Sequence, residues 1–223
     1  MKRISDTTLK EIIFGMEDGM VSTLGALTGV AIGSQNMDVV ILTGTVIIAV
    51  ESISMGIGSF LSSQSIKERQ LMEIESERRQ VRHETLTEKL ELEKMLIRDG
   101  WSKKIAKLMV AEAGEKKELL FSEMQYRELG IQIKNLHNNK HSAWGMFIAY
   151  VIGGFIPLSA YFIFSLPTAM WWSIGFSLIG LFILGLVVSD RPGITRLKRA
   201  LRMVVFGGVA ILIGVLAGMF FRI

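Results

Sequence analysis

Two apolar stretches of the chain carry acidic side chains at spacings that place them on one face of a helix. In residues 12–33, the positions i, i+4, i+7 and i+11 are Asp18, Ser22, Gly25 and Gly29. In residues 39–62, the same spacing is repeated by Glu51, Met55, Gly58 and Ser62. Carboxylate oxygens bind divalent cations and exchange protons, and a thioether favours softer transition metals. If the two faces meet across their small residues, they form a polar seam able to pass a metal ion one way and protons the other.

The members of this seam differ in how strongly they indicate an ion path. A charged side chain at the centre of a membrane helix costs about 3 kcal/mol even on insertion scales, and such acids usually face a cavity or a partner, so Glu51 favours an ion path. Asp18 is only a turn or two into its stretch, where an acid can also lie at the membrane surface. Met55, taken alone, is more often a packing residue.

A second group of carboxylates lies between the apolar stretches. Its members recur at intervals of four, seven, four and three residues and are Glu73, Glu77, Glu84, Glu88 and Glu91. This spacing predicts an acidic face on one long helix. Further along, EMQYREL brings Glu123, Met124 and Glu128 within little more than one turn. Acids from two helices can gather around metal ions, although by spacing alone a solvated face with interspersed Lys and Arg is more common.

Five helical segments are long and apolar enough to cross a bilayer core, which takes about 20 residues. They are residues 12–33, 39–62, 142–165, 168–189 and 200–221. The first is the least hydropathic, because it contains Glu17 and Asp18, but its glycines favour a packed bundle helix. Half of the 223 residues are apolar, which is unusual for a soluble domain of this size. The predicted fold class is an all-α membrane protein with five transmembrane helices, and the lipid bilayer is its first partner.

Residues 63–140 form a charged three-helix insert between the second and third spans, with no Pro and only three Gly. No helix breaker occurs in residues 59–80, so the second membrane helix is predicted to continue into the insert. RDGWS (98–102) predicts a helix stop at Gly100 and an N-cap at Ser102, and a third helix is expected over about 114–137. Apolar residues recur at helical spacing, as on one face of an amphipathic helix: Leu86, Leu90, Ile97, Ile105, Leu108 and Met109.

The chain therefore divides into residues 1–62, with an N-terminal arm and two spans, the insert 63–140, and residues 141–223, with three spans. Lys and Arg concentrate in the arm, the insert and the last connection, 191–202. By the positive-inside rule, the N-terminus and the insert are cytosolic. The first apolar stretch is not a signal peptide, because acidic residues interrupt it.

Several kinds of chemistry are disfavoured. The chain has no Cys and only three scattered His, which argues against thiolate, structural zinc and Glu-x-x-His di-iron sites. There is no GxxxxGK[ST] loop, so ATP-driven pumping is not expected. The basic stretch 191–202 is flanked by spans and fits a topology signal or an anionic lipid contact better than nucleic acid. We predict neither an enzyme nor a permanent cofactor.

Four motifs occur in a fixed order along the chain: EDGMVSTLGALTGVAIG (17–33), ISMGIGSFLSSQS (53–65), RELGI (127–131) at the end of the insert, and VIGGFIPL (151–158). Together they resemble the vacuolar iron transporter family over nearly the whole chain. The resemblance implies a five-span homodimer that moves ferrous iron out of the cytosol in exchange for protons. It also implies an ion path at the dimer interface, lined by the first two spans.

The resemblance implies roles for individual residues. Asp18 and Met55 match the family's first-span Asp and second-span Met, and Glu51 is added to the path on its chemistry alone. In the family, the cytosolic insert is a metal-binding domain, and the matching positions here are Glu77, Glu88, Glu91, Met124 and Glu128. Gln80 replaces a carboxylate of the family pattern, and Glu73 or Glu84, one turn away, is an additional candidate that would compensate.

The resulting prediction is a proton-coupled antiporter that exports a divalent transition metal, foremost Fe²⁺, with Mn²⁺, Co²⁺ or Zn²⁺ as further substrates. A Mn²⁺ exporter is the nearest alternative, and Met ligands favour iron modestly. A membrane-anchored metal buffer or sensor is a second alternative, but it would not need polar faces in two spans. A scaffold that dimerises through Gly-rich helices is a third, and it predicts no metal binding by the isolated fragment 63–140. A prokaryotic plasma membrane is the expected location, with a vacuolar membrane as the alternative.

Overall fold

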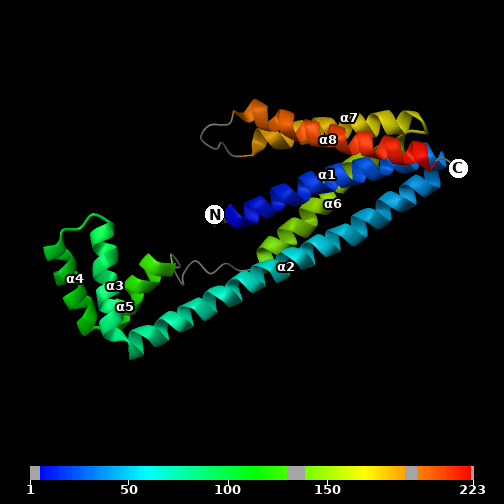
Figure 1. The fold of residues 1–223 in the computed structure, drawn as a ribbon. Coiled ribbons are helices and arrows are strands. Elements are labelled where there is room, and N and C mark those ends of the chain that lie inside the picture. Colours follow the sequence, from blue (N-terminus) through cyan, green and yellow to red (C-terminus); the bar gives the residue numbers. More distant parts are fainter. Residues whose placement is uncertain (1–5, 130–138, 189–194, 222–223) are drawn as a thin grey trace. The chain divides into compact units, whose positions relative to one another are not determined.

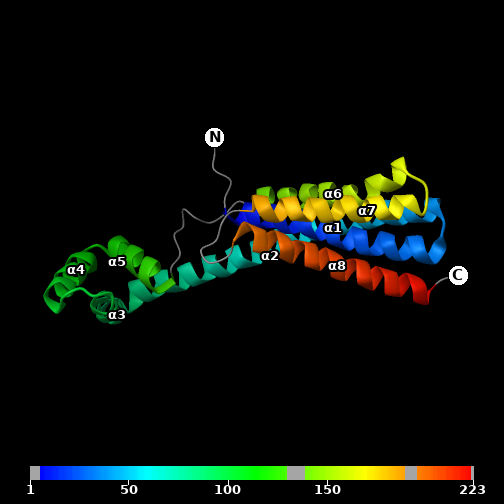
Figure 2. The same ribbon diagram turned by 90° about the horizontal axis from the view of Figure 1, so that it is seen from above.

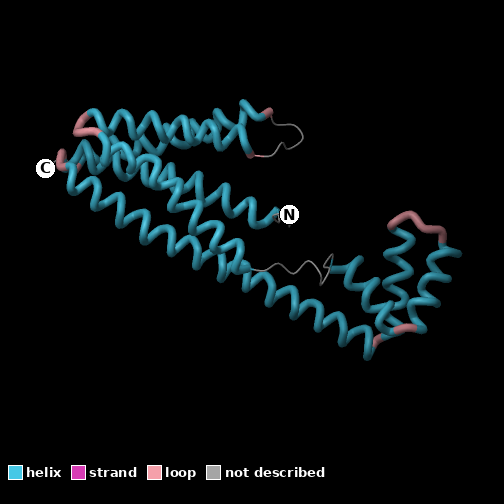
Figure 3. Tube along the Cα trace, turned by 180° about the vertical axis from the view of Figure 1, so that it is seen from behind, coloured by secondary structure: helices cyan, strands magenta, loops and turns pink. Residues whose placement is uncertain are grey.

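The structure is a computed structural model that describes residues 6–129, 139–188 and 195–221. These residues form helices joined by short loops, with no strand among them (Figure 3). They fall into two compact units. One unit comprises Met1–Leu61 and Asn139–Ile223, and the other comprises Ser62–Asn138.

The first unit is a helical bundle made of α1 (Asp6–Ser34), the first part of α2 (Met37–His83), α6 (Asn139–Ile163), α7 (Thr168–Val187) and α8 (Arg196–Phe220). Helix α1 packs against α6, α7 and α8, and α7 also contacts α6 and α8. Figures 1 and 2 show these four helices side by side along their lengths. Leu27 of α1, Val40 and Ile48 of α2 and Leu158 of α6 share one buried cluster, which brings α2 into the bundle.

Four of the described helices are long and apolar enough to cross a membrane: α2, α6, α7 and α8. They contain the predicted spans 39–62, 142–165, 168–189 and 200–221, apart from a few terminal residues. Helix α1 has sufficient length at 29 residues, but its acidic and basic side chains keep it out of this group. The protein is thus a helical membrane protein, and the fifth span rests on the packing of α1 within the bundle.

Glycines set the distance between α1 and its neighbours. A Cβ added at Gly19 of α1 would lie 2.4 Å from the carbonyl oxygen of Tyr150, so the backbones of α1 and α6 are in direct contact. On the α8 side, a Cβ added at Gly29 would lie 2.9 Å from the carbonyl oxygen of Gly214. Gly58 of α2, by contrast, has nothing within 4 Å of an added Cβ. Within one chain, the first two spans therefore do not meet through these glycines: those of α1 pack against α6 and α8.

Basic residues collect at one end of this bundle. The first residues of α1, α6 and α8 lie at the same end (Figure 1), and their first two turns contain Lys10, Lys140 and a group in α8. The α8 group is Arg196, Lys198, Arg199 and Arg202. The opposite ends of these helices have no such group among the described residues.

The second unit consists of the end of α2, α3 (Thr85–Arg98), α4 (Lys103–Glu115), α5 (Lys117–Met124) and a π-helical turn, η1 (Gln125–Leu129). Helix α2 continues without a break for 47 residues from the apolar stretch into the charged one, as predicted. The predicted stop and cap are also confirmed: Gly100 has a φ of +99°, and Ser102 accepts a hydrogen bond from the amide of Ile105. The predicted third helix, 114–137, begins at Lys117 instead, because α4 continues to Glu115; residues 130–137 of the prediction lie outside the described part.

The predicted apolar face of the insert is not its buried face. Leu86 is 74% exposed. Leu90, Ile97, Ile105 and Leu108 are exposed as well, and only Met109 packs partly against the core. The core is formed instead by Ile74, Val81, Leu92, Leu96, Ala106, Val110, Ala113, Leu120, Phe121 and Met124. The reason is the register of α3, whose inward face is Glu88, Leu92 and Leu96, at i, i+4 and i+8.

Candidate metal sites

Three carboxylates meet in the second unit. Glu77 of α2, Glu88 of α3 and Glu128 of η1 each offer one oxygen, and these oxygens lie within 4.8 Å of one another. Glu77 is 2% exposed and Glu88 is 3% exposed, whereas Glu128 is open to solvent. One oxygen of Glu77 and one of Glu88 have no hydrogen-bond partner among the described residues. Buried charges are otherwise paired or coordinate metals, so this acidic cluster has the composition of a divalent cation site.

A break in the helix brings this acidic cluster together. Glu77 and Glu88 are 11 residues apart, which would separate them by about 16 Å along a continuous helix. The chain turns at Glu84, where φ is −120° and ψ is 37°. Thr85 Oγ1 donates a 2.7 Å hydrogen bond to the carbonyl of Val81 across the turn. The prediction of one long acidic face is therefore wrong: the acidic residues lie on two helices that face each other.

Burial and mutual repulsion shift the protonation of the acidic cluster. Burial, followed by the charges of Glu128 and Glu88, raises the pKa of Glu77 to about 8. Burial, followed by the charges of Glu91, Glu128 and Glu84, raises the pKa of Glu88. Around neutral pH, Glu77 therefore retains a proton unless a cation takes its place. Binding of a metal ion here therefore displaces this proton from the molecules in which Glu77 is protonated.

The other predicted residues of the insert lie around the acidic cluster. Met124 is fully buried in the core, one turn before Glu128. Glu91 is half-buried and Glu84 is exposed, and both act electrostatically on Glu88. Glu73 pairs with Arg69 at 2.9 Å, and Gln80 is exposed; neither belongs to the group of three converging oxygens.

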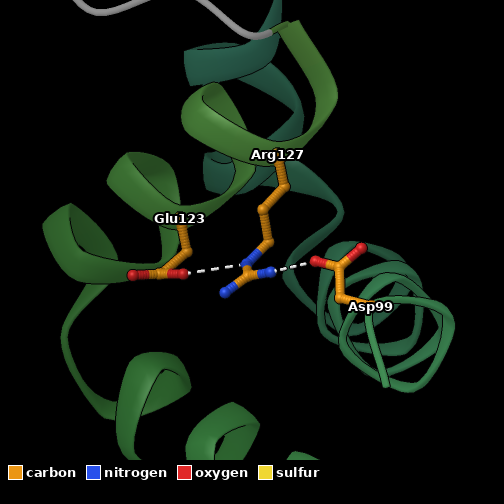
Figure 4. Close-up of polar contacts among 3 residues, drawn as sticks. All are labelled: Asp99, Glu123 and Arg127. Atoms are coloured by element: carbon orange, nitrogen blue, oxygen red, sulfur yellow. Dashed lines mark hydrogen bonds and ion pairs between the residues drawn. The ribbon is translucent and has the colours of Figure 1, made fainter. Parts of the chain in front are cut away.

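An arginine ties down the segment that carries Glu128. Arg127 Nε donates to Glu123 Oε2 at 3.0 Å, and its Nη1 donates to the carboxylate of Asp99, at the end of α3 (Figure 4). Its side chain is only 15% exposed. Glu123, which sequence spacing grouped with Met124 and Glu128, is thus an ion-pair partner of Arg127. The spacing of Glu123 and Arg127 was visible in the sequence, but the contact with Asp99, 28 residues away, was not.

In the membrane unit, Asp18 and Glu51 come near each other. Their carboxylates interact electrostatically across α1 and α2. Asp18 is half-buried and lines an open cavity of about 670 Å³ between α1, α2 and α8, together with Ser22, Thr43 and Ile47. The side chain of Glu51 is exposed on the surface of the unit, and Met55 is half-buried. Asp18 and Glu51 are therefore close enough to influence each other electrostatically.

A tyrosine that the sequence analysis did not single out joins this region. The hydroxyl of Tyr150, on α6, lies 2.7 Å from Ser22 Oγ, which itself donates a 2.7 Å hydrogen bond to the carbonyl of Asp18. Tyr150 also interacts electrostatically with Asp18 and Glu51. No motif marks Tyr150, because the pairing of α6 with α1 cannot be read from spacing along the chain.

Comparison with known proteins gives a consistent result over nearly the whole chain. The model of the VIT family matches residues 9–219. "Vacuolar iron transporter 1" of Arabidopsis thaliana is 27% identical, covering 91% of this chain and 81% of the relative. "Vacuolar iron transporter 1" of Tulipa gesneriana is 23% identical over 91% of this chain and 82% of the relative. "Vacuolar iron transporter" of Plasmodium falciparum is 27% identical over 94% of this chain and 81% of the relative.

Proposed function

The chain belongs to the VIT family, and from this premise we propose that it is a proton-coupled antiporter that exports Fe²⁺ from the cytosol. The observation that carries the proposal is the acidic cluster of Glu77, Glu88 and Glu128, in which two buried oxygens have no hydrogen-bond partner within the described residues. A divalent cation supplies the charge that this arrangement lacks. The curated relatives are named as iron transporters, which favours Fe²⁺ as that cation.

The transport path in this proposal follows Asp18, Glu51 and Met55. Asp18 and Glu51 approach each other, and Asp18 faces the cavity between α1, α2 and α8. A proton and a metal ion compete for the same carboxylate oxygens, so that binding of one displaces the other. With an acidic outer compartment, protons move inward through this path as metal moves outward. Helix α1 is the fifth span, because its Asp18 lines the path and its glycines pack inside the bundle.

Exposure of Glu51 supports a homodimer. In a single chain, this carboxylate lies on the surface of α2 beside exposed apolar residues, including Val50, Ile53 and Ile57. A carboxylate facing lipid is costly, so acids in spans almost always face a protein interior or a water-filled cavity. A second copy of the chain packed on this surface of α2 encloses Glu51 at the interface. Met55 lies one turn further along the same helix.

The orientation follows from the charges at the helix ends. The end of the bundle with Lys10, Lys140 and the basic group of α8 is the cytosolic end. The acidic cluster of the insert then binds metal from the cytosol. The same arrangement serves a plasma membrane or a vacuolar membrane, because both separate the cytosol from a more acidic compartment.

Reconstitution into proteoliposomes tests the proposal. We expect Fe²⁺ flux that responds to an imposed pH gradient and is strongly reduced by Asp18→Asn or Met55→Ala. Asp38→Asn is a matched control, because Asp38 is an exposed acid in the first turn of α2. Fe²⁺ flux that is unchanged by Asp18→Asn contradicts the proposed path. Metal binding without flux indicates a membrane-anchored buffer, and flux of Mn²⁺ in preference to Fe²⁺ indicates a manganese exporter.

A further inference from the structure

We infer that Tyr150 is a positioning residue of the transport path, which holds Asp18 opposite Glu51 by a hydrogen bond to Ser22. This inference rests on the proposed function and extends it to a residue outside the first two spans. Tyr150 lies on α6, whereas Asp18 and Ser22 lie on α1 and Glu51 lies on α2. Its hydroxyl contacts Ser22 of α1 and interacts electrostatically with Glu51 of α2, so it links three helices.

The hydrogen bonds form a short directed chain. Ser22 Oγ has one proton, which it donates to the carbonyl of Asp18 at 2.7 Å. The 2.7 Å contact between Ser22 Oγ and the hydroxyl of Tyr150 is then donated by Tyr150. A serine that bonds to the carbonyl four residues earlier bends its helix locally. Tyr150 thus fixes the geometry of α1 at the residue that carries the acid of the path.

Packing leaves this tyrosine little freedom. Tyr150 has 0% exposure and is the largest fully buried side chain of the described residues. Gly19 of α1 lies directly on the backbone of Tyr150, and Gly153, one turn further along α6, lies on the backbone of Met16. Because the two helices are in backbone contact, the tyrosine ring is held between them. Its hydroxyl remains aimed at Ser22.

A second buried tyrosine on the same helix provides a matched control. Tyr161 is 2% exposed, and its hydroxyl faces Ser173 of α7. The hydroxyl of Tyr150 interacts electrostatically with Asp18 and Glu51, whereas that of Tyr161 interacts with Ser173. Phenylalanine at either position removes one hydroxyl and keeps the ring that fills the core. Any difference between the two variants therefore reports on the contacts of the Tyr150 hydroxyl, with Ser22 and Thr23, rather than on packing of α6.

The experiment measures initial Fe²⁺ flux in proteoliposomes containing the full chain, over a range of Fe²⁺ concentration and pH. For Tyr150→Phe we expect KM to rise about fivefold, the factor that corresponds to loss of a hydrogen bond worth about 1 kcal/mol. We also expect the midpoint of the pH profile to move, because Asp18 then presents its carboxylate differently to protons. Tyr161→Phe leaves both quantities unchanged.

Ser22→Ala tests the same bond from its other side. It should reproduce the KM and pH effects of Tyr150→Phe, and the double variant should add little to either single change. If Tyr150→Phe fails to fold, Ser22→Ala gives the answer alone. The inference is overturned if Ser22→Ala or Tyr150→Phe matches the unmodified chain in KM and pH profile, while Asp18→Asn still abolishes flux. If Asp18→Asn also transports normally, the proposed ion path fails, which is a distinct outcome.

Discussion

Replacing Glu77 by Gln removes a buried charge and keeps the shape of the side chain. Glu77 is the most deeply buried member of the acidic cluster, and burial together with Glu128 and Glu88 raises its pKa to about 8. We expect Glu77→Gln to have opposite effects on two properties of the insert. Metal affinity falls, because a ligand charge is lost. Stability of the metal-free protein at alkaline pH rises, because no charge has to be buried.

The pKa of Glu77 gives the size of the proton effect. With a pKa of about 8, roughly nine in ten molecules hold this proton at pH 7, so metal binding releases about 0.9 proton from Glu77. Below pH 8, metal affinity falls by up to about tenfold for each pH unit as this proton competes. Glu77→Gln should release about 0.9 proton fewer per metal ion, with a flatter pH dependence. The remaining dependence comes from Glu88, whose pKa is also raised.

The sign of the stability effect follows from the same shift. A pKa that is higher in the folded protein than in the unfolded chain means that the folded form binds more protons between the two values. Stability of the metal-free insert therefore falls as pH rises from about 4.5 towards 8 and stays low above it. The shift from 4.5 to about 8 corresponds to an upper limit of about 5 kcal/mol. Glu77→Gln removes this loss.

Calorimetric titration of the full chain with Fe²⁺, under anaerobic conditions and in two buffers of different ionisation enthalpy, measures both affinity and proton release. Glu73→Gln is the control, since Glu73 lies one turn earlier on α2 and pairs with Arg69. We expect the control to bind and release protons like the unmodified chain. Equal proton release from Glu77→Gln and the unmodified chain would refute the account of the acidic cluster given above.

Two further predictions concern the arginine that holds the turn of Glu128 and the glycine that packs α1 against α6. Arg127→Gln should lower Fe²⁺ affinity several-fold in the same titration, because it frees the turn that carries Glu128. Arg79→Gln, which breaks an exposed pair with Glu75, should leave the affinity unchanged. Equal affinities of the two variants would exclude positioning by Arg127. Gly19→Ala should destabilise the bundle by about 1–3 kcal/mol, because its methyl group meets the backbone of α6. Gly175→Ala, with nothing within 4 Å, should leave the thermal unfolding midpoint in detergent unchanged, and equal midpoints for both variants would contradict the packing argument.

The helices of the membrane unit could largely be predicted, because their signals are local. Long apolar runs identify α2, α6, α7 and α8, and the continuation of α2 into the charged insert follows from the absence of Gly and Pro. Gly100 and Ser102 mark the end of α3 and the start of α4. The turn at Glu84 has no such marker, so the facing arrangement of Glu77 and Glu88 could not be predicted. Which helices pack together was also beyond local signals, and the contact between Tyr150 and Ser22 depends on it.

The insert breaks the usual distribution of side chains in one consistent way. On α3, the apolar residues Leu86 and Leu90 face outward, and the acid between them, Glu88, faces inward. This register buries Leu92 and Leu96, each worth about 1.5–3 kcal/mol, but it also encloses Glu88, and burying an unpaired carboxylate is unfavourable. Natural sequences break such rules mainly at functional sites. In the function proposed above, a cation bound between Glu77, Glu88 and Glu128 offsets the cost of enclosing Glu88, which gives the burial of this acid a physical reason.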